Sequence, residues 1–298
     1  MSSCMSEYVY PSSVEEAVAC LERHPGEGRV IAGGTDLLPD LRKGRIAPRC
    51  LVDITRIPGL RQIEVDGGVV TVGAGVTFAA LRKHRFLCQH VHALVDAAAS
   101  VGAGAIQNAA TWVGNIVQAL PAADGAIIAL ALDAEAEIVN RDGARWEPVG
   151  SLFAGPGRST IDPTSEIISR LRFSGPWTGV GTAWRRVGRR AALVLPILNC
   201  AVRVELETAS AGEETVSTVA IALGPVAPRP YRARRAETFL RGRPPRTDVL
   251  SQTAKIAQSE ANPRTSVTRA SAAYRRDILP TLVEDALREA VGRAGGRP

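Results

Sequence analysis

The sequence predicts an α+β fold, in which strands and helices share the chain without strict alternation. In the first half, short apolar strands end at glycine turns, and Asp66-Gly67-Gly68 and Asp142-Gly143 are typical of hairpins, since glycine readily takes a positive φ. The second half holds two long β-type runs and ends in an amphipathic helix. Strict alternation would instead indicate a parallel α/β fold.

The first half is expected to open with a helix at 14–21, which Ser12 or Ser13 caps. Thr35 and Thr77 are expected to cap later helices, because a threonine hydroxyl accepts a hydrogen bond from the first turn. The further helices are expected at 36–43, 78–84, 94–100 and 126–132, and the strands at 29–32, 51–54, 62–65, 69–72, 136–139 and 145–148.

The pattern changes near residues 175–181, where glycine and proline interrupt it. Two β-type runs follow, at 191–207 and 215–223, and apolar residues at helical spacing predict a final helix at 278–291. We therefore expect two domains, 1–176 and 177–298, which agrees with the prior for a chain of 298 residues.

The charge of the chain is +6, from 36 basic and 30 acidic residues, and arginine supplies most of the excess. One arginine-rich stretch lies at 229–246, and a second group comprises Arg185, Arg186, Arg189 and Arg190. Such segments can bind nucleic acid, but stacking on bases needs interleaved aromatic residues, which are scarce here. We expect no nucleic acid and interpret these arginines as a solvated or partner-facing surface.

Several classes of protein are disfavoured. Apolar runs are far shorter than the 18 to 20 residues of a membrane span, and the first residues do not resemble a secretory signal. The cysteines are odd in number and widely spaced, which favours reduced thiols in the cytoplasm and disfavours a zinc or iron–sulfur site on this chain; they are Cys4, Cys20, Cys50, Cys88 and Cys200. Phosphate-loop, GxSxG, HExxH and complete GxGxxG motifs are absent.

Two glycine-bearing turns could bind a nucleotide. At 30–37 a strand enters Gly33-Gly34, where missing β-carbons would let backbone N–H groups approach a phosphate. At 111–116 a similar turn holds Asn115, and Asp124 follows as an acceptor for a ribose hydroxyl or as a helix N-cap. Two such turns in one domain could clamp a dinucleotide, although tight turns without a ligand would look the same.

Together these segments resemble the FAD-binding medium subunit of the molybdenum hydroxylases, the family of xanthine dehydrogenase and carbon monoxide dehydrogenase. The resemblance covers nearly the whole chain. It is carried by VIAGGTDLLPDLRKG (30–44), LVDITRIPGL (51–60), TVGAGVTFAALR (71–82), QNAATWVGNI (107–116), PAADGAIIALALDAEAEI (121–138), GPGRS (155–159), AWRRVGRRAALVLPILNCAVRV (183–204), ALGPVAPRPYRARRAE (222–237) and SAAYRRDILPTL (271–282).

The resemblance implies a two-part FAD-binding domain of the vanillyl-alcohol-oxidase/PCMH type, with subdomains of about 1–60 and 61–176, followed by an antiparallel-sheet-plus-helix domain. It also implies roles for individual residues. The FAD pyrophosphate and its surroundings are assigned to Val30, Ile31, Ala32, Gly33, Gly34, Thr35, Asp36, Leu37, Thr111, Gly114 and Asn115, the ribose to Asp124, the isoalloxazine ring to Ile168, and a cation near the flavin pyrimidine to Arg185.

The family pattern TIGGN reads Thr-Trp-Val-Gly-Asn here, so Trp112 and Val113 occupy places where the family has isoleucine and glycine. FAD is the only cofactor that the resemblance implies on this chain. A molybdenum–pterin cofactor and 2Fe–2S clusters are expected on a large and a small partner subunit, in a dimer of heterotrimers. Two alternatives stay open: a stand-alone FAD-dependent reductase of the same superfamily, and a basic nucleic-acid-binding protein.

Overall fold

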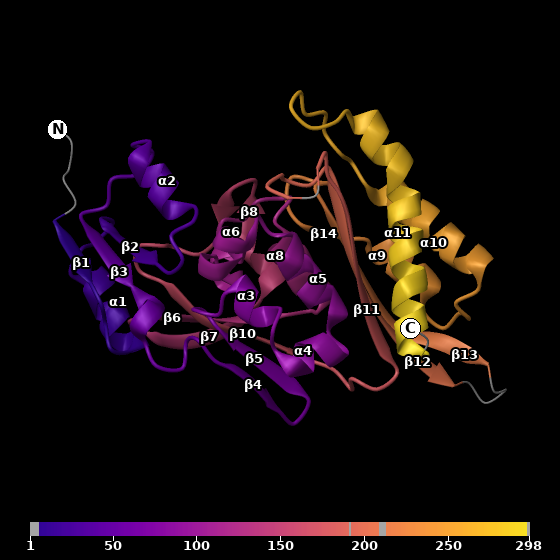
Figure 1. Cartoon of the computed structure of the whole chain (residues 1–298), viewed down its shortest axis with the longest axis horizontal. Coiled ribbons are helices and arrows are strands. Elements are labelled where there is room, and N and C mark those ends of the chain that lie inside the picture. Colours follow the sequence, from indigo (N-terminus) through magenta and orange to yellow (C-terminus); the bar gives the residue numbers. More distant parts are fainter. Residues whose placement is uncertain (1–5, 191, 209–212, 297–298) are drawn as a thin grey trace.

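The computed structural model describes residues 6–190, 192–208 and 213–296. Cys4 and Ala191, which belong to the cysteine and strand predictions, lie outside these ranges. Figure 1 shows a small N-terminal sheet at one end, a central sheet with helices, and a C-terminal sheet covered by the long helix α11 (Ala272–Ala294) at the other. This mixture of helices and mainly antiparallel strands confirms the predicted α+β class.

The N-terminal sheet has three parallel strands in the order β1 (Glu7–Val9), β3 (Cys50–Asp53) and β2 (Gly28–Ile31). Helix α1 (Val14–Glu22) packs on it, and the 3₁₀ turn η1 (Ile54–Arg56) follows β3. Ser13 Oγ accepts a hydrogen bond of 3.1 Å from the backbone N–H of Glu16, whose carboxylate in turn accepts from Ser12. This capping box confirms the predicted helix start.

Helix α2 (Leu37–Arg42) is shorter than predicted, and its N-cap is Asp36 without a side-chain hydrogen bond. The predicted capping by Thr35 is therefore wrong. The reason lies in Gly34, whose φ of +66° turns the chain so that the first helical bond runs from the N–H of Leu38 to the Gly34 carbonyl.

The central sheet is antiparallel, with the strand order β4-β5-β10-β6-β7. Its strands are β4 (Ile63–Asp66), β5 (Val69–Gly73), β10 (Ile167–Ser174), β6 (Glu135–Asn140) and β7 (Gly143–Pro148). Both predicted hairpins are confirmed, since β4 pairs with β5 and β6 with β7 across the glycine turns. The short elements η2 (Val149–Leu152), β8 (Phe153–Gly155) and β9 (Arg158–Ser159) lead into β10.

Six helices lie between β5 and β6: α3 (Phe78–Leu81), α4 (Arg85–His90), α5 (His92–Ser100), α6 (Gly104–Ala109), α7 (Trp112–Val117) and α8 (Asp124–Ala131). Thr77 caps α3 as predicted, through a 3.2 Å bond from the N–H of Ala80. The helix predicted at 78–84 ends earlier, at Leu81, and a separate helix, α4, begins at Arg85.

The C-terminal sheet is antiparallel, with the order β11 (Val180–Val187), β12 (Leu198–Thr208), β13 (Glu214–Gly224) and β14 (Tyr231–Arg232). The same part of the chain contains the helices α9 (Arg234–Leu240), α10 (Thr247–Glu260) and α11. The run predicted as a strand from 191 begins its strand only at Leu198, and residues 192–197 form a loop instead. Pro280 interrupts the backbone bonding of α11, and Gln258 compensates by donating a 2.8 Å bond to the carbonyl of Arg276.

The two predicted domains meet through buried groups. Arg232 pairs with Glu237 in its own domain and reaches across to Asp133 and to the carbonyl of Leu130 on α8. Trp184 and Ala201 belong to the same buried apolar cluster as the central helices. The predicted boundary at 176–177 lies in the link between β10 and β11. None of the helices in the described ranges combines the length and apolar character that a membrane crossing requires.

Candidate functional site

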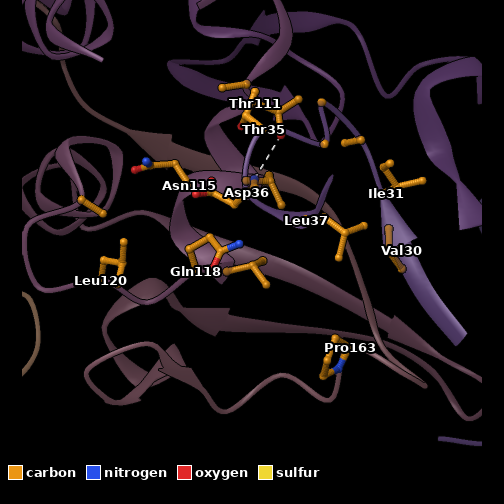
Figure 2. Close-up of a pocket in the computed structure, with 18 of the residues that line it drawn as sticks. Val30, Ile31, Thr35, Asp36, Leu37, Thr111, Asn115, Gln118, Leu120 and Pro163 are labelled. Carbon is orange, nitrogen blue, oxygen red and sulfur yellow. Dashed lines mark hydrogen bonds between the residues drawn. The ribbon is translucent and has the colours of Figure 1, made fainter. Parts of the chain in front are cut away.

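The two glycine-bearing turns meet at one cavity of about 660 Å³. Figure 2 shows residues of both turns around it, including Thr35, Thr111 and Asn115. A volume of this size fits a ligand-binding pocket. Of the fourteen residues assigned from the sequence, all but Arg185 line it: Val30, Ile31, Ala32, Gly33, Gly34, Thr35, Asp36, Leu37, Thr111, Gly114, Asn115, Asp124 and Ile168.

Gly33 brings the two turns together. A β-carbon on Gly33 would lie 1.9 Å from the carbonyl oxygen of Ala109, which immediately precedes the second turn. The backbones of the two turns therefore touch where a side chain would separate them. The missing β-carbon of Gly33 therefore makes room for the chain itself, a role that the sequence interpretation did not include.

The first turn presents unused hydrogen-bond donors to the cavity. Within the described ranges, the backbone N–H groups of residues 33–36 have no acceptor in the chain. A left-handed Gly34 in such a row makes a concave arrangement of N–H groups that binds anions. Burial raises the pKa of the Asp36 carboxyl, and the neighbouring Asp40 raises it further.

The segment predicted as a second turn is in fact the start of helix α7, because Thr111 is its N-cap and residues 112–117 are helical. We keep the name second turn for residues 111–116, whose side chains hold them in place. Thr111 Oγ1 accepts a 3.0 Å hydrogen bond from the N–H of Gly114, drawn as a dashed line in Figure 2. Asn115 Oδ1 accepts a 2.9 Å bond from the N–H of Gly125, which leaves Asn115 Nδ2 without a partner among the described residues. Trp112 is fully buried and donates to the Gly125 carbonyl, so this bulky residue leaves the cavity free.

Asp124 forms a buried polar group on the cavity wall. It is the first residue of α8, and its carboxylate accepts hydrogen bonds from Asn199 Nδ2 at 2.6 Å and Ser100 Oγ at 3.3 Å. Arg186 Nε lies 3.5 Å away. Burial raises the pKa of Asp124 to about 6, although Arg186 and the hydrogen bonds act in the opposite direction. The N-cap of α8 is Ala123, so Asp124 does not cap the helix.

Comparisons with known proteins agree with this geometry. Residues 4–174 match the family model described as the FAD binding domain in molybdopterin dehydrogenase, and residues 183–290 match the CO dehydrogenase flavoprotein C-terminal domain. The chain belongs to this molybdopterin dehydrogenase FAD-binding family. The resemblance inferred from the motifs is thereby confirmed, and so are the two-domain architecture and the presence of an FAD-binding domain.

Relatives within the family align along nearly their whole length. The xanthine dehydrogenase FAD-binding subunit of Escherichia coli O157:H7 is 30% identical over 98% of both chains. The carbon monoxide dehydrogenase medium chain of Hydrogenophaga pseudoflava is 28% identical over 96% of this chain and 97% of the relative. A solved structure of the Hydrogenophaga pseudoflava carbon monoxide dehydrogenase covers 98% of this chain and 99% of its own, with a TM-score of 0.89. The relatives are subunits of oxidoreductases, which confirms the predicted enzyme class.

The cavity of this family member fits FAD on its own geometry. The row of free N–H groups at 33–36 suits a pyrophosphate, because phosphate oxygens accept several hydrogen bonds at once. Apolar side chains line other parts of the wall, among them Ile161, Ile168 and Val194, as a flat ring system requires. The donor set and the apolar wall therefore match the pyrophosphate in the middle of the coenzyme and a flat ring system at its end.

Arg185 does not line this cavity. On β11 successive side chains point to opposite faces, so Arg185 faces α11 and forms an ion pair with Glu289. Arg186 instead points toward Asp124, is 10% exposed, and donates to the carbonyl of Val194. The sequence-based assignment of a flavin-facing cation to Arg185 is therefore corrected, since a shift of one residue in a strand reverses the face.

The sequence interpretation missed several residues of the cavity. Asn199 and Ser100 contact Asp124 from segments far away in the chain, and no local pattern relates them to it. The loop at 192–197 contributes Val194 and Leu195, which read as part of a strand in the sequence. Further missed residues that line the cavity are Arg29, Gln118, Leu120, Ile161 and Pro163.

We expect the substitution Asp124→Asn to flatten the dependence of stability on pH between about 4 and 6. The folded pKa of about 6 exceeds the ordinary 3.8, so the folded protein binds more protons than the unfolded chain in this window. The free energy of unfolding of the wild type then falls as the pH rises from about 4 to 6, by about 2 kcal/mol. Urea unfolding at a series of pH values measures the difference.

A matched control is Asp142→Asn, which removes an exposed carboxylate at a hairpin. We expect its pH profile to follow that of the wild type. If Asp124→Asn and the wild type had parallel profiles from pH 4 to 7, the buried carboxyl would not carry the raised pKa.

Proposed function

We propose that this chain is the FAD-carrying medium subunit of a molybdenum hydroxylase. It would take electrons from the 2Fe–2S clusters of a small partner subunit and pass them to an external acceptor, while a large molybdenum–pterin subunit hydroxylates the substrate. The observation that carries the proposal is the row of unpartnered N–H groups at 33–36 beside a cavity that the second turn closes. We assign residues 1–176 to FAD binding, in two subdomains, and 177–298 to the C-terminal domain.

In this proposal the residues of the chain bind and orient the coenzyme. The N–H groups at 33–36 hold the pyrophosphate, with Val30, Ile31, Ala32 and Leu37 beside it. Thr111, Gly114 and Asn115 complete the grip, because the Asn115 Nδ2 donor has no other partner. Asp124 accepts from a ribose hydroxyl, and Ile168 packs against the ring. Bound FAD supplies the redox chemistry between a one-electron donor and an external acceptor.

The relatives support partner subunits for this chain. The solved carbon monoxide dehydrogenase from Hydrogenophaga pseudoflava is described as lacking the Mo-pyranopterin moiety of its molybdenum cofactor, which names that cofactor in the relative. By this likeness we propose a large and a small partner and a dimer of heterotrimers. Location in the cytoplasm and the absence of nucleic acid stay predictions. Three arginines of the stretch 229–246 pair with acids, namely Arg232, Arg234 and Arg246.

The substitution Gly34→Val tests where the coenzyme binds. A β-branched residue is disfavoured at φ +66° and would contact Leu38 and Ile31, so the turn must change shape and its N–H groups no longer converge. Since a hydrogen bond to a charged group contributes about 1.5–3 kcal/mol, we expect FAD to bind roughly tenfold to a hundredfold more weakly. Flavin absorbance of the purified chain and titration of the stripped protein measure the affinity.

The matched control is Gly44→Val. Gly44 has nearly the same φ of +64°, has open space around its Cα, and does not line the cavity. It carries the same backbone strain, and we expect it to keep wild-type FAD affinity. A Gly34→Val protein that retains full FAD would contradict the placement of the pyrophosphate. An isolated chain that turns over a substrate of its own would favour the stand-alone reductase.

A further inference from the structure

Helix α11 begins beside a buried arginine without a counter-ion. Arg275 lies in its first turn and is 2% exposed. Its Nη1 donates a 3.2 Å hydrogen bond to the carbonyl of Pro225, while its Nε is buried without a partner. The guanidinium is always charged, so the folded chain keeps a positive charge here with a single backbone acceptor.

Two further arginines lie in the loop that leads into this helix. Arg269 and Arg264 belong to the loop between α10 and α11, which lies at the upper end of the C-terminal domain in Figure 1. Burial lowers the pKa of Arg275, and the charges of Arg269 and Arg264 lower it further. The first turn of α11 contains no acid, and the helix dipole adds positive potential at this end.

The chain itself offers no carboxylate for these arginines. Among the described residues, Arg264, Arg269 and Arg275 have no ion pair with an aspartate or glutamate, although many other arginines do. The residues outside the described ranges contain no aspartate or glutamate at all. A buried charge without a partner is strongly unfavourable, so an anion that pairs with it would stabilise this arrangement.

We propose that Arg275, Arg269 and Arg264 form a binding site for an oxyanion, a carboxylate or phosphate group, that another molecule supplies. The chemistry matches, because the planar guanidinium presents paired N–H donors that fit two oxygens of such a group. The Nε of Arg275 is the donor that the chain leaves unused. The site is distinct from the FAD cavity, since none of its three arginines lines that cavity.

The full chain, with FAD bound, tests the proposal by titration with inorganic phosphate and, separately, with a short acetylated peptide of glutamates. The readouts are the binding constant from calorimetry and the shift of Tm, with chloride holding the ionic strength constant. We expect the wild type to bind one of these probes. Arg269→Ala is expected to weaken that binding roughly tenfold to a hundredfold, as the loss of a charged hydrogen bond predicts. Tighter phosphate binding indicates a free anion, and tighter peptide binding indicates a carboxylate of another polypeptide.

Arg275→Met gives a second, independent readout. Methionine keeps the apolar stem but removes the buried charge, so in chloride the variant should have a Tm equal to or above that of the wild type. With saturating probe, the wild type should become the more stable protein, because the anion then pairs with Arg275. A variant that has a lower Tm in chloride and still binds the probe like the wild type would overturn the proposal.

Arg276→Ala is the matched control, since Arg276 is the next residue on α11 and its side chain is exposed. We expect it to bind the probe like the wild type. If the wild type did not bind either probe, the proposal would be wrong. An equal response of all variants would indicate a general salt effect and would also overturn the proposal. Flavin absorbance should stay unchanged in every variant, which separates failure of this site from failure of the proposed FAD function.

Discussion

The substitution Gly33→Ala is expected to produce a folded protein that has lost most of its FAD. The new β-carbon would lie 1.9 Å from the carbonyl oxygen of Ala109 and 3.0 Å from the N–H nitrogen of Ala110. Carbon contacts are favourable only near 3.5–4.0 Å, so the two turns must move apart. The coenzyme would then lose donors from one turn, and with about 1.5–3 kcal/mol for each charged hydrogen bond we expect at least a hundredfold weaker binding for two of them.

The control for this experiment is Gly104→Ala, at the start of α6. Gly104 belongs to the segment that leads into the second turn, and a β-carbon there meets nothing within 4 Å. We expect normal FAD content and stability. Flavin absorbance after gel filtration and the dissociation constant of the stripped protein are the measurements. If Gly33→Ala held FAD as tightly as Gly104→Ala, the contact between the two turns would not position the coenzyme.

The substitution Gly181→Ala is expected to lower the free energy of unfolding of the C-terminal domain strongly. A β-carbon on Gly181 would lie 1.8 Å from the carbonyl oxygen of Ala290 and 2.6 Å from the nitrogen of Ala294. Both atoms belong to the backbone of α11, which cannot give way as a flexible side chain can. Overpacking typically costs about 1–3 kcal/mol of stability. Because the helix backbone is rigid, we expect the loss of unfolding free energy for Gly181→Ala to be about 3 kcal/mol or more.

Urea unfolding, followed by the fluorescence of Trp184 on β11, measures this loss of stability. The control is Gly155→Ala on β8, where the nearest atom to a β-carbon is a side-chain carbon of Arg158 at 4.0 Å. We expect that variant to lie within about 0.5 kcal/mol of the wild type. An unfolding free energy for Gly181→Ala that matched the control would mean that α11 does not lie against β11 as described.

Much of the fold follows from local signals in the sequence. Ser13 caps α1 and Thr77 caps α3 because a hydroxyl just before an apolar helix accepts a free N–H of its first turn. The glycine pair at 67–68 makes a hairpin because both residues take positive φ. The same kind of signal located the first turn of the site, since glycine after the short apolar strand β2 is visible without any structure.

Contacts between distant segments could not be predicted in this way. The face of the sheet on which Arg185 lies depends on the register of β11 against β12. A shift of one residue would put Arg185 where Arg186 lies, on the face toward Asp124. The helix start predicted at Thr35 failed because the conformation of Gly34 displaced it. Asn199 reaches Asp124 only because α8 packs on the C-terminal sheet.

By itself, the amino-acid sequence determined the class of fold, the places of the two turns and the family to which they belong, because these depend on residues that are neighbours in the chain. Only the tertiary structure decided that Gly33 lies against the backbone of Ala109 and that Arg186 rather than Arg185 lies near the carboxylate of Asp124. It also decided that the side chain of Arg275 is buried, with its Nε lacking a hydrogen-bond partner among the described residues. Burial and electrostatic partners are properties of segments brought together in space, and the order of residues does not specify them locally.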